Sequence, residues 1–149
     1  MKTIRNITSL VLAFTVSAAS LVAAEKIVAG PKGGRLLETQ PQKAEFFVTK
    51  DRKVEVTFYD AALKPVAPSA QQVTITAEPK TGRTPVELAK TATGFTSKTA
   101  LPESAEPYRV VVQIRATPEA KPANFRIDLN TDTCGECHHA EYACTCTGH

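Results

Sequence analysis

Every cysteine and every histidine of this sequence lies at its C-terminal end. The four cysteines and three histidines are confined to residues 134–149, and residues 1–133 contain neither type. Thiolates and imidazoles bind thiophilic metal ions well, and they also attach c-type haem. The sequence therefore predicts a scaffold without ligands that is followed by a ligand-rich tail. The candidate donors are Cys134, Cys137, Cys144, Cys146, His138, His139 and His149.

The first hypothesis for the tail is a metal site made of thiolates. The C-x-x-C pair and the C-x-C pair can each hold one ion, and Gly135 is expected to ease the turn within the first pair. Thiolates suit Zn²⁺ in tetrahedral geometry and Cu⁺ because of its softness. The predicted ligands are Cys134, Cys137, Cys144 and Cys146, with His138 and His139 as further donors and His149 in reserve.

A second hypothesis is covalent haem c, because Cys134 to His138 reads C-x-x-C-H. In that pattern the two thiols bond to the haem vinyl groups and the histidine binds the iron. The protein would then be a small c-type cytochrome-like electron carrier. Polar residues surround the motif, however, and the pattern leaves Cys144 and Cys146 without a role.

Two further hypotheses concern sulfur chemistry without an ion. Exported proteins often form disulfides, and Cys134 can pair with Cys144 or Cys146 while Cys137 takes the other. Such a stapled tail would suit a structural module or an efflux adaptor. A thiol–disulfide oxidoreductase using Cys134 and Cys137 is the fourth hypothesis, although no thioredoxin-like unit precedes the motif.

The N-terminus has the layout of an export signal. Lys2 and Arg5 precede an apolar run over residues 7–22, and small residues end at Ala24, where cleavage is predicted. No second hydrophobic span follows, so we expect a periplasmic or secreted protein without membrane insertion after signal removal. Loss of Lys2 and Arg5 leaves 16 of the 18 basic residues against 15 acidic ones. This near-neutral balance gives no electrostatic reason to expect nucleic-acid binding.

The scaffold consists of short runs in which apolar and polar residues alternate, which is typical of half-buried strands. Strands without intervening helices must pack sheet on sheet, so we predict an all-β, immunoglobulin-like β-sandwich of about seven strands. A small barrel is the alternative. Residues 25–43 are predicted as an N-terminal arm or edge strand, 44–130 as the sandwich and 131–149 as the tail. The predicted strands are 44–48, 54–59, 73–77, 86–88, a strand starting at 95, 108–116 and 125–129.

One stretch of the scaffold resembles a known family. Phe58-Tyr59-Asp60, then Lys64-Pro65-Val66, then Val73-Thr74-Ile75-Thr76 is similar to the strand, D-x-x-x-K-P-V, strand entry of bacterial immunoglobulin-like periplasmic domains. These are the YtkA-like and CopC-like modules, which are associated with copper handling and heavy-metal efflux adaptors. The resemblance implies a periplasmic sandwich and metal-efflux partners. The His and Met ligands of CopC-type copper sites have no counterpart in this scaffold.

The scaffold shows no catalytic set, so we predict a protein that is not an enzyme. Its serines have no histidine partner, and its acidic residues occur singly at strand positions that we expect to face solvent. Gly30, Gly33 and Gly34 around Lys32 lack the spacing of a phosphate-binding loop.

Overall fold

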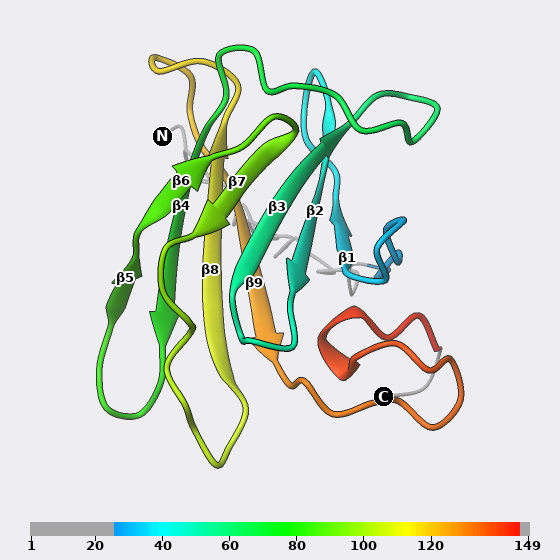
Figure 1. Ribbon diagram of the computed structural model, residues 1–149, viewed down its shortest axis with the longest axis vertical. Coiled ribbons are helices and arrows are strands. Elements are labelled where there is room, and N and C mark those ends of the chain that lie inside the picture. Colours follow the sequence, from blue (N-terminus) through cyan, green and yellow to red (C-terminus); the bar gives the residue numbers. More distant parts are fainter. Residues whose placement is uncertain (1–25, 147–149) are drawn as a thin grey trace, which may run out of the picture.

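The computed structural model describes residues 26–146, which form two antiparallel β-sheets packed face to face and contain no α-helix (Figure 1). This confirms the predicted all-β sandwich. The five-stranded sheet has the order β1 (Arg35–Leu37), β2 (Lys43–Val48), β3 (Val54–Tyr59), β7 (Gly94–Ser97) and β6 (Leu88–Lys90). The four-stranded sheet has the order β5 (Thr84–Val86), β4 (Gln72–Glu78), β8 (Tyr108–Arg115) and β9 (Ala123–Leu129).

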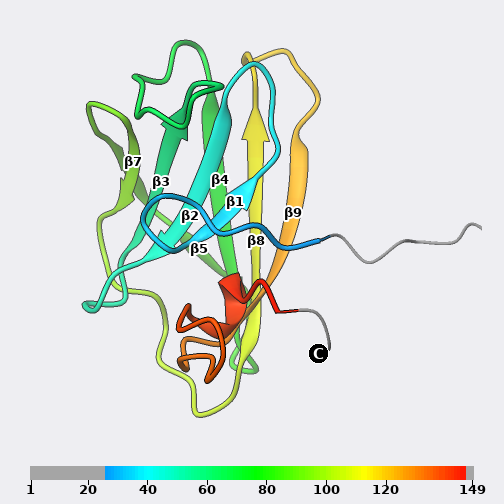
Figure 2. The same ribbon diagram turned by 90° about the vertical axis from the view of Figure 1, so that its right-hand side faces the viewer.

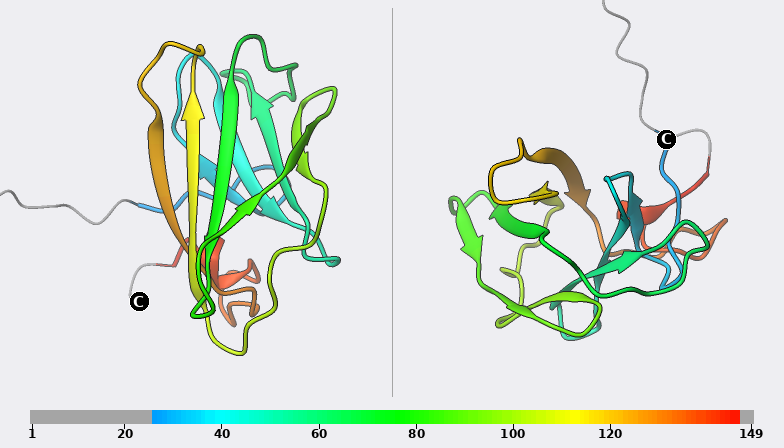
Figure 3. Two further views of the ribbon diagram at one scale, coloured as in Figure 1. Left: turned by 90° about the vertical axis from the view of Figure 1, so that its left-hand side faces the viewer. Right: turned by 90° about the horizontal axis from the view of Figure 1, so that it is seen from above.

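The strand order is that of an immunoglobulin-type sandwich. With β2 as strand A, the order β2-β3-β7-β6 corresponds to A-B-E-D, and β4-β8-β9 corresponds to C-F-G. Strands β1 and β5 are added at the edges of the two sheets. Figure 3 shows the two layers from the side and from above.

Period-two alternation determines which side chains form the core. In β8, Val110, Val112 and Ile114 are buried, whereas Arg109, which precedes them, faces solvent. Strand β9 pairs with β8 and repeats the pattern, with Phe125, Ile127 and Leu129 buried. The inner faces of both sheets therefore close over one apolar core, as the alternation predicted.

The predicted strand over residues 86–88 is wrong in one respect, because the chain changes sheets there. Thr84–Val86 pairs with β4 in one sheet, and Leu88–Lys90 pairs with β7 in the other, with Glu87 at the crossing. Alternation is a local signal and does not tell which sheet a residue joins. Pro85 cannot donate a ladder hydrogen bond, which fits the edge position of β5.

Glu45 contradicts the prediction that the acidic residues of the scaffold face solvent. Its side chain is fully buried in β2, and its carboxylate accepts hydrogen bonds from the amides of Lys32 (3.0 Å) and Gly34 (2.8 Å) and from the Tyr59 hydroxyl (2.7 Å). The glycine-rich turn thus does bind an anion, and that anion is the protein's own carboxylate. Gly30 is required there, because an added Cβ would lie 2.3 Å from the Glu45 carboxyl carbon.

We predict that Glu45→Ala lowers the free energy of unfolding by about 3 kcal/mol, because it leaves several buried donors without an acceptor. Urea unfolding followed by circular dichroism measures the change. Glu55→Ala is the matched control on the neighbouring strand. Its ion pair with Lys32 (2.6 Å) is partly exposed, so the expected loss is below about 1 kcal/mol. Equal losses of unfolding free energy in the two variants would contradict the stabilising role assigned to the buried Glu45 carboxylate and its hydrogen bonds.

The predicted leader, residues 1–24, lies outside the described residues. Within residues 26–146, no helix has the length and apolar character needed to cross a bilayer.

Candidate metal centre

The tail folds back onto the sandwich directly after β9. The amide of Tyr142 donates to the carbonyl of Asn130 (3.0 Å), and the amide of Glu141 donates to the carbonyl of Asp132 (2.8 Å). An antiparallel bridge between Thr133 and Ala140 continues this pairing. The segment between Thr133 and Ala140 is therefore closed into a short loop. The tail lies beside the ends of β1 and β9 (Figure 2).

The loop carries the first cysteine pair in a fixed turn. The amide of Cys134 donates to the His139 carbonyl (2.8 Å), and the amide of His138 donates to the Cys134 carbonyl (3.1 Å). The left-handed residue of this turn is His138, with φ of 59°. The His139 amide next in the chain donates a hydrogen bond to the Cys137 sulfur.

A single helical turn brings the second pair to the first. The 3₁₀ helix η1 (Glu141–Ala143) is closed by a hydrogen bond from the Cys144 amide to the Glu141 carbonyl (3.1 Å). Cys144 follows η1 directly, and Cys146 lies two residues further along the chain. This turn thus places the sulfurs of Cys144 and Cys146 near those of the first cysteine pair, although the two pairs are separated in the sequence.

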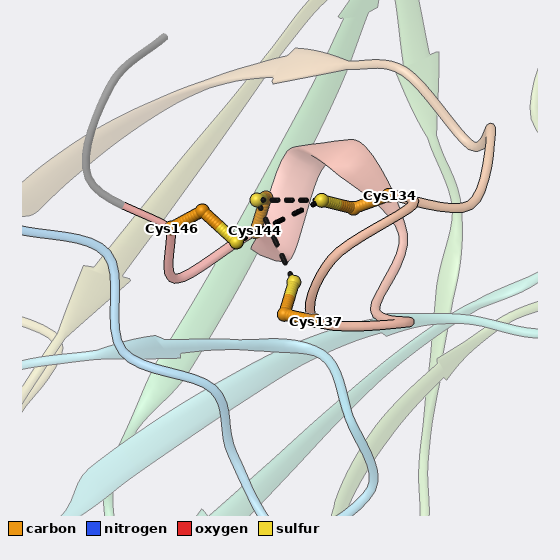
Figure 4. Close-up of side chains that lie close together, drawn as sticks. All are labelled: Cys134, Cys137, Cys144 and Cys146. Carbon is orange, nitrogen blue, oxygen red and sulfur yellow. Dashed lines mark hydrogen bonds between the residues drawn. The ribbon is translucent and has the colours of Figure 1, made fainter.

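The four cysteine sulfurs converge on one point (Figure 4). All of them lie within 4.8 Å of one another. Cys134 Sγ lies 3.2 Å from Cys144 Sγ and 3.8 Å from Cys146 Sγ, and Cys137 Sγ lies 3.5 Å from Cys144 Sγ. Tetrahedral zinc with Zn–S bonds of about 2.3 Å places neighbouring sulfurs about 3.8 Å apart. The cluster can therefore hold a metal ion with little rearrangement.

The tail is anchored by Tyr142. Its ring is buried and meets Phe46 edge to face, with the centroids 5.7 Å apart. The hydroxyl of Tyr142 accepts a hydrogen bond from the Val48 amide (3.0 Å). Because Phe46 and Val48 belong to β2, this one side chain fixes the cysteine loops to the five-stranded sheet.

Backbone amides lower the pKa of one thiol, whereas neighbouring thiols and burial raise the pKa values of two others. The His139 amide, and after it the Thr145 amide, lower the pKa of Cys137 to about 6. The pKa of Cys146 is raised, first by the Cys144 thiol and then by burial and the Glu136 carboxylate. For Cys144 the Cys146 amide favours the thiolate, but the Cys134 thiol, burial and the Cys137 thiol outweigh it and raise the pKa. Cys137 is thus mostly thiolate at pH 7.

In the reduced, metal-free protein at pH 7, we predict that iodoacetamide alkylates Cys137 on the order of tenfold faster than Cys144. The lowered pKa of Cys137 makes it mostly thiolate, and its side chain is half-buried whereas that of Cys144 is buried. Peptide mass mapping after brief labelling measures the order. The labelling rate of Cys137 should decline as the pH falls below about 6, where Cys137 takes up a proton, and the selectivity over Cys144 should narrow as the pH rises and Cys144 begins to ionise. Equal rates at both thiols would contradict the prediction.

The two described histidines lie outside this group of sulfurs. His138 is exposed, and the His139 ring packs near the glycine-rich turn, with its Nδ1 3.4 Å from a Cβ built on Gly33. His149 lies outside the described residues. Haem attachment needs both Cys134 and Cys137 to reach the haem edge, whereas Cys134 is 2% exposed and faces Cys144. The arrangement therefore fits a single ion better than a haem.

None of the four cysteines forms a disulfide in this structure, so neither predicted disulfide pairing is formed. The 3.2 Å between Cys134 Sγ and Cys144 Sγ exceeds the disulfide bond length of about 2.05 Å. The sulfurs share one centre instead of forming two separate pairs.

Comparison with protein-family models, curated proteins and solved structures finds no match for this chain. The resemblance to the YtkA-like and CopC-like modules stays a prediction, and the functional argument rests on the geometry of the cluster.

Proposed function

We propose that this protein binds one thiophilic metal ion through Cys134, Cys137, Cys144 and Cys146, and that it serves as an exported, non-catalytic protein for metal sequestration or delivery. The observation that carries the proposal is the convergence of the four sulfurs within 4.8 Å. Two of them come from buried side chains, which are 2% exposed at Cys134 and 4% at Cys144. Sulfurs held inward at these separations match the ligand set of a single ion.

Of the two ions expected from the sequence, Zn²⁺ fits the arrangement better than Cu⁺. Zinc takes four ligands tetrahedrally, and four thiolates complete that number. The amides of His139 and Thr145 donate to the Cys137 sulfur, and the amide of Cys146 donates to that of Cys144. Hydrogen bonds of this kind offset part of the negative charge that four thiolates place around the ion.

The position of the cluster supports a site that carries an ion for transfer, and not a structural site that holds the sandwich together. The apolar core is built from both sheets, and Tyr142 and Ala143 are its only members among residues 131–146. The sulfurs lie in a loop beside the sandwich, so the ion is not needed to close the core. The predicted leader and the family resemblance suggest export and metal-efflux partners.

Metal analysis of protein purified without chelators tests the proposal. We expect one zinc ion per chain by mass spectrometry under native conditions, and four thiols that react only after the ion is removed. Substitution by Co²⁺ should give the visible spectrum of a tetrahedral tetrathiolate. The variant with all four cysteines changed to serine is the control. Metal-free protein with two disulfides would overturn the proposal, and a coloured band that survives denaturation after co-expression with haem-maturation machinery would replace it with the cytochrome alternative.

A further inference from the structure

The tail contacts structure on both faces of β2. Successive side chains of a strand point to opposite faces, so Phe46 and Glu45 lie on opposite sides of β2. On the core side, Phe46 meets the ring of Tyr142. On the other side, the glycine-rich turn of residues 30–34 covers Glu45, and the tail meets this turn through His139. Figures 1 and 2 show the turn beside the tail. The cysteine loops thus have a second support besides Tyr142.

The glycine-rich turn is closed by hydrogen bonds of its own and by Glu45. The amide of Gly33 donates to the carbonyl of Gly30 (2.9 Å), and the amide of Gly30 donates to the carbonyl of Gly34 (2.8 Å). The buried carboxylate of Glu45 accepts hydrogen bonds from the amides of Lys32 and Gly34. Gly33 lies between these two amides in the chain, so the bonds to Glu45 fix its position.

The His139 ring packs on this turn at Gly33. A Cβ built on Gly33 would lie 3.4 Å from Nδ1 and 3.9 Å from Cε1 of His139, so the ring lies where a side chain at Gly33 would begin. His139 is half-buried, whereas the neighbouring His138 is exposed. The carbonyl of His139 accepts the hydrogen bond of the Cys134 amide (2.8 Å). The seat of the ring therefore affects the backbone of the loop that carries Cys134 and Cys137.

We infer that Glu45 and His139 are positioning residues of the metal site and that they couple the glycine-rich turn to the first cysteine pair. Glu45 holds the turn, the turn supports the His139 ring, and the His139 carbonyl holds the Cys134 amide. The inference rests on the proposed function. Coupling between two sites is reciprocal, so a turn that favours zinc binding is itself stabilised when zinc is bound.

Hydrogen exchange of two amides in the full chain tests this reciprocity. The amides of Lys32 and Gly34 donate to Glu45, so their exchange reports opening of the turn. Added zinc should slow their exchange on the order of tenfold. In His139→Ala the same addition should leave the two rates unchanged, whereas the control His138→Ala should keep the native response. Rates that ignore zinc in the native protein, or that slow equally in His139→Ala, would overturn the inference.

A double-mutant cycle on zinc affinity gives an independent test, with competition by a chelator as the measurement. Glu45→Gln replaces one acceptor oxygen with an NH₂ group, which cannot accept the hydrogen bonds that close the turn. It should weaken zinc binding on the order of tenfold in the native chain and have little effect in the His139→Ala background. Ile127→Val, a buried change in the other sheet, is the control for lost stability and should leave zinc affinity unchanged.

The outcomes of the cycle separate the inference from the proposed function. If Glu45→Gln binds zinc as tightly as the native protein, or loses the same affinity with and without the His139 ring, the positioning role is wrong while the metal site stands. The same holds if Ile127→Val loses as much affinity as Glu45→Gln. If the native protein takes up no zinc, the proposed function fails and the inference fails with it.

Discussion

Replacing Cys134 with serine is expected to lower the affinity for Zn²⁺ by at least about a hundredfold. Removal of groups that only support metal ligands already costs about 10–100-fold, and Cys134 is a direct ligand in the proposed site. Its sulfur contacts those of Cys144 and Cys146, and its side chain is nearly fully buried. A serine hydroxyl there is a poor zinc ligand, and no neighbouring histidine belongs to the cluster. Competition with a chelator of known affinity measures the change.

His138→Ala is the matched control for this experiment. His138 adjoins Cys137 but is exposed and lies outside the group of sulfurs, so zinc affinity should be unchanged. The same variant separates the two metal hypotheses, because His138 would be the iron ligand in a c-type haem site. A large loss of metal binding in His138→Ala would contradict the four-cysteine site.

Replacing Tyr142 with alanine is expected to destabilise the protein by about 3 kcal/mol and to weaken zinc binding. The substitution removes a buried aromatic ring from its contact with Phe46 and leaves the Val48 amide without its acceptor. Because Tyr142 joins the tail to β2, more of the energy for ordering the cysteine loops must then come from the ion. Urea unfolding, with and without zinc, measures both effects.

Two controls define the source of this effect. Tyr142→Phe retains the ring and removes only the hydroxyl, so a loss of about 1 kcal/mol is expected. Val28→Ala changes a side chain that is 43% exposed, and its effect should stay within about 0.5 kcal/mol. If Tyr142→Ala binds zinc as tightly as the native protein, the tail orders without this anchor, and the anchoring role assigned to Tyr142 is wrong.

Alternation alone predicted the sandwich where strands are long and have one buried face. In β8 and β9 the apolar residues recur at every second position, because successive side chains of a strand point to opposite faces. The same signal predicted the wrong environment for Glu45. Its position between Ala44 and Phe46 suggested a polar residue that faces solvent, whereas its side chain is buried. Its partners are amides of the 30–34 turn and a hydroxyl from β3, and no local pattern reveals contacts of this kind.

For the metal centre, the sequence determined the chemistry of the donors, since cysteines crowded into residues 134–149 have the same ligand properties in any fold. The tertiary structure decided which donors meet. The Thr133–Ala140 bridge, the left-handed His138 and the turn at η1 bring four sulfurs together and leave the imidazoles of His138 and His139 outside. The physical reason is that convergence depends on backbone hydrogen bonds and on the seating of Tyr142 against β2. The contacts of Tyr142 join residues that lie far apart in the chain, so spacing within the motif could not specify them.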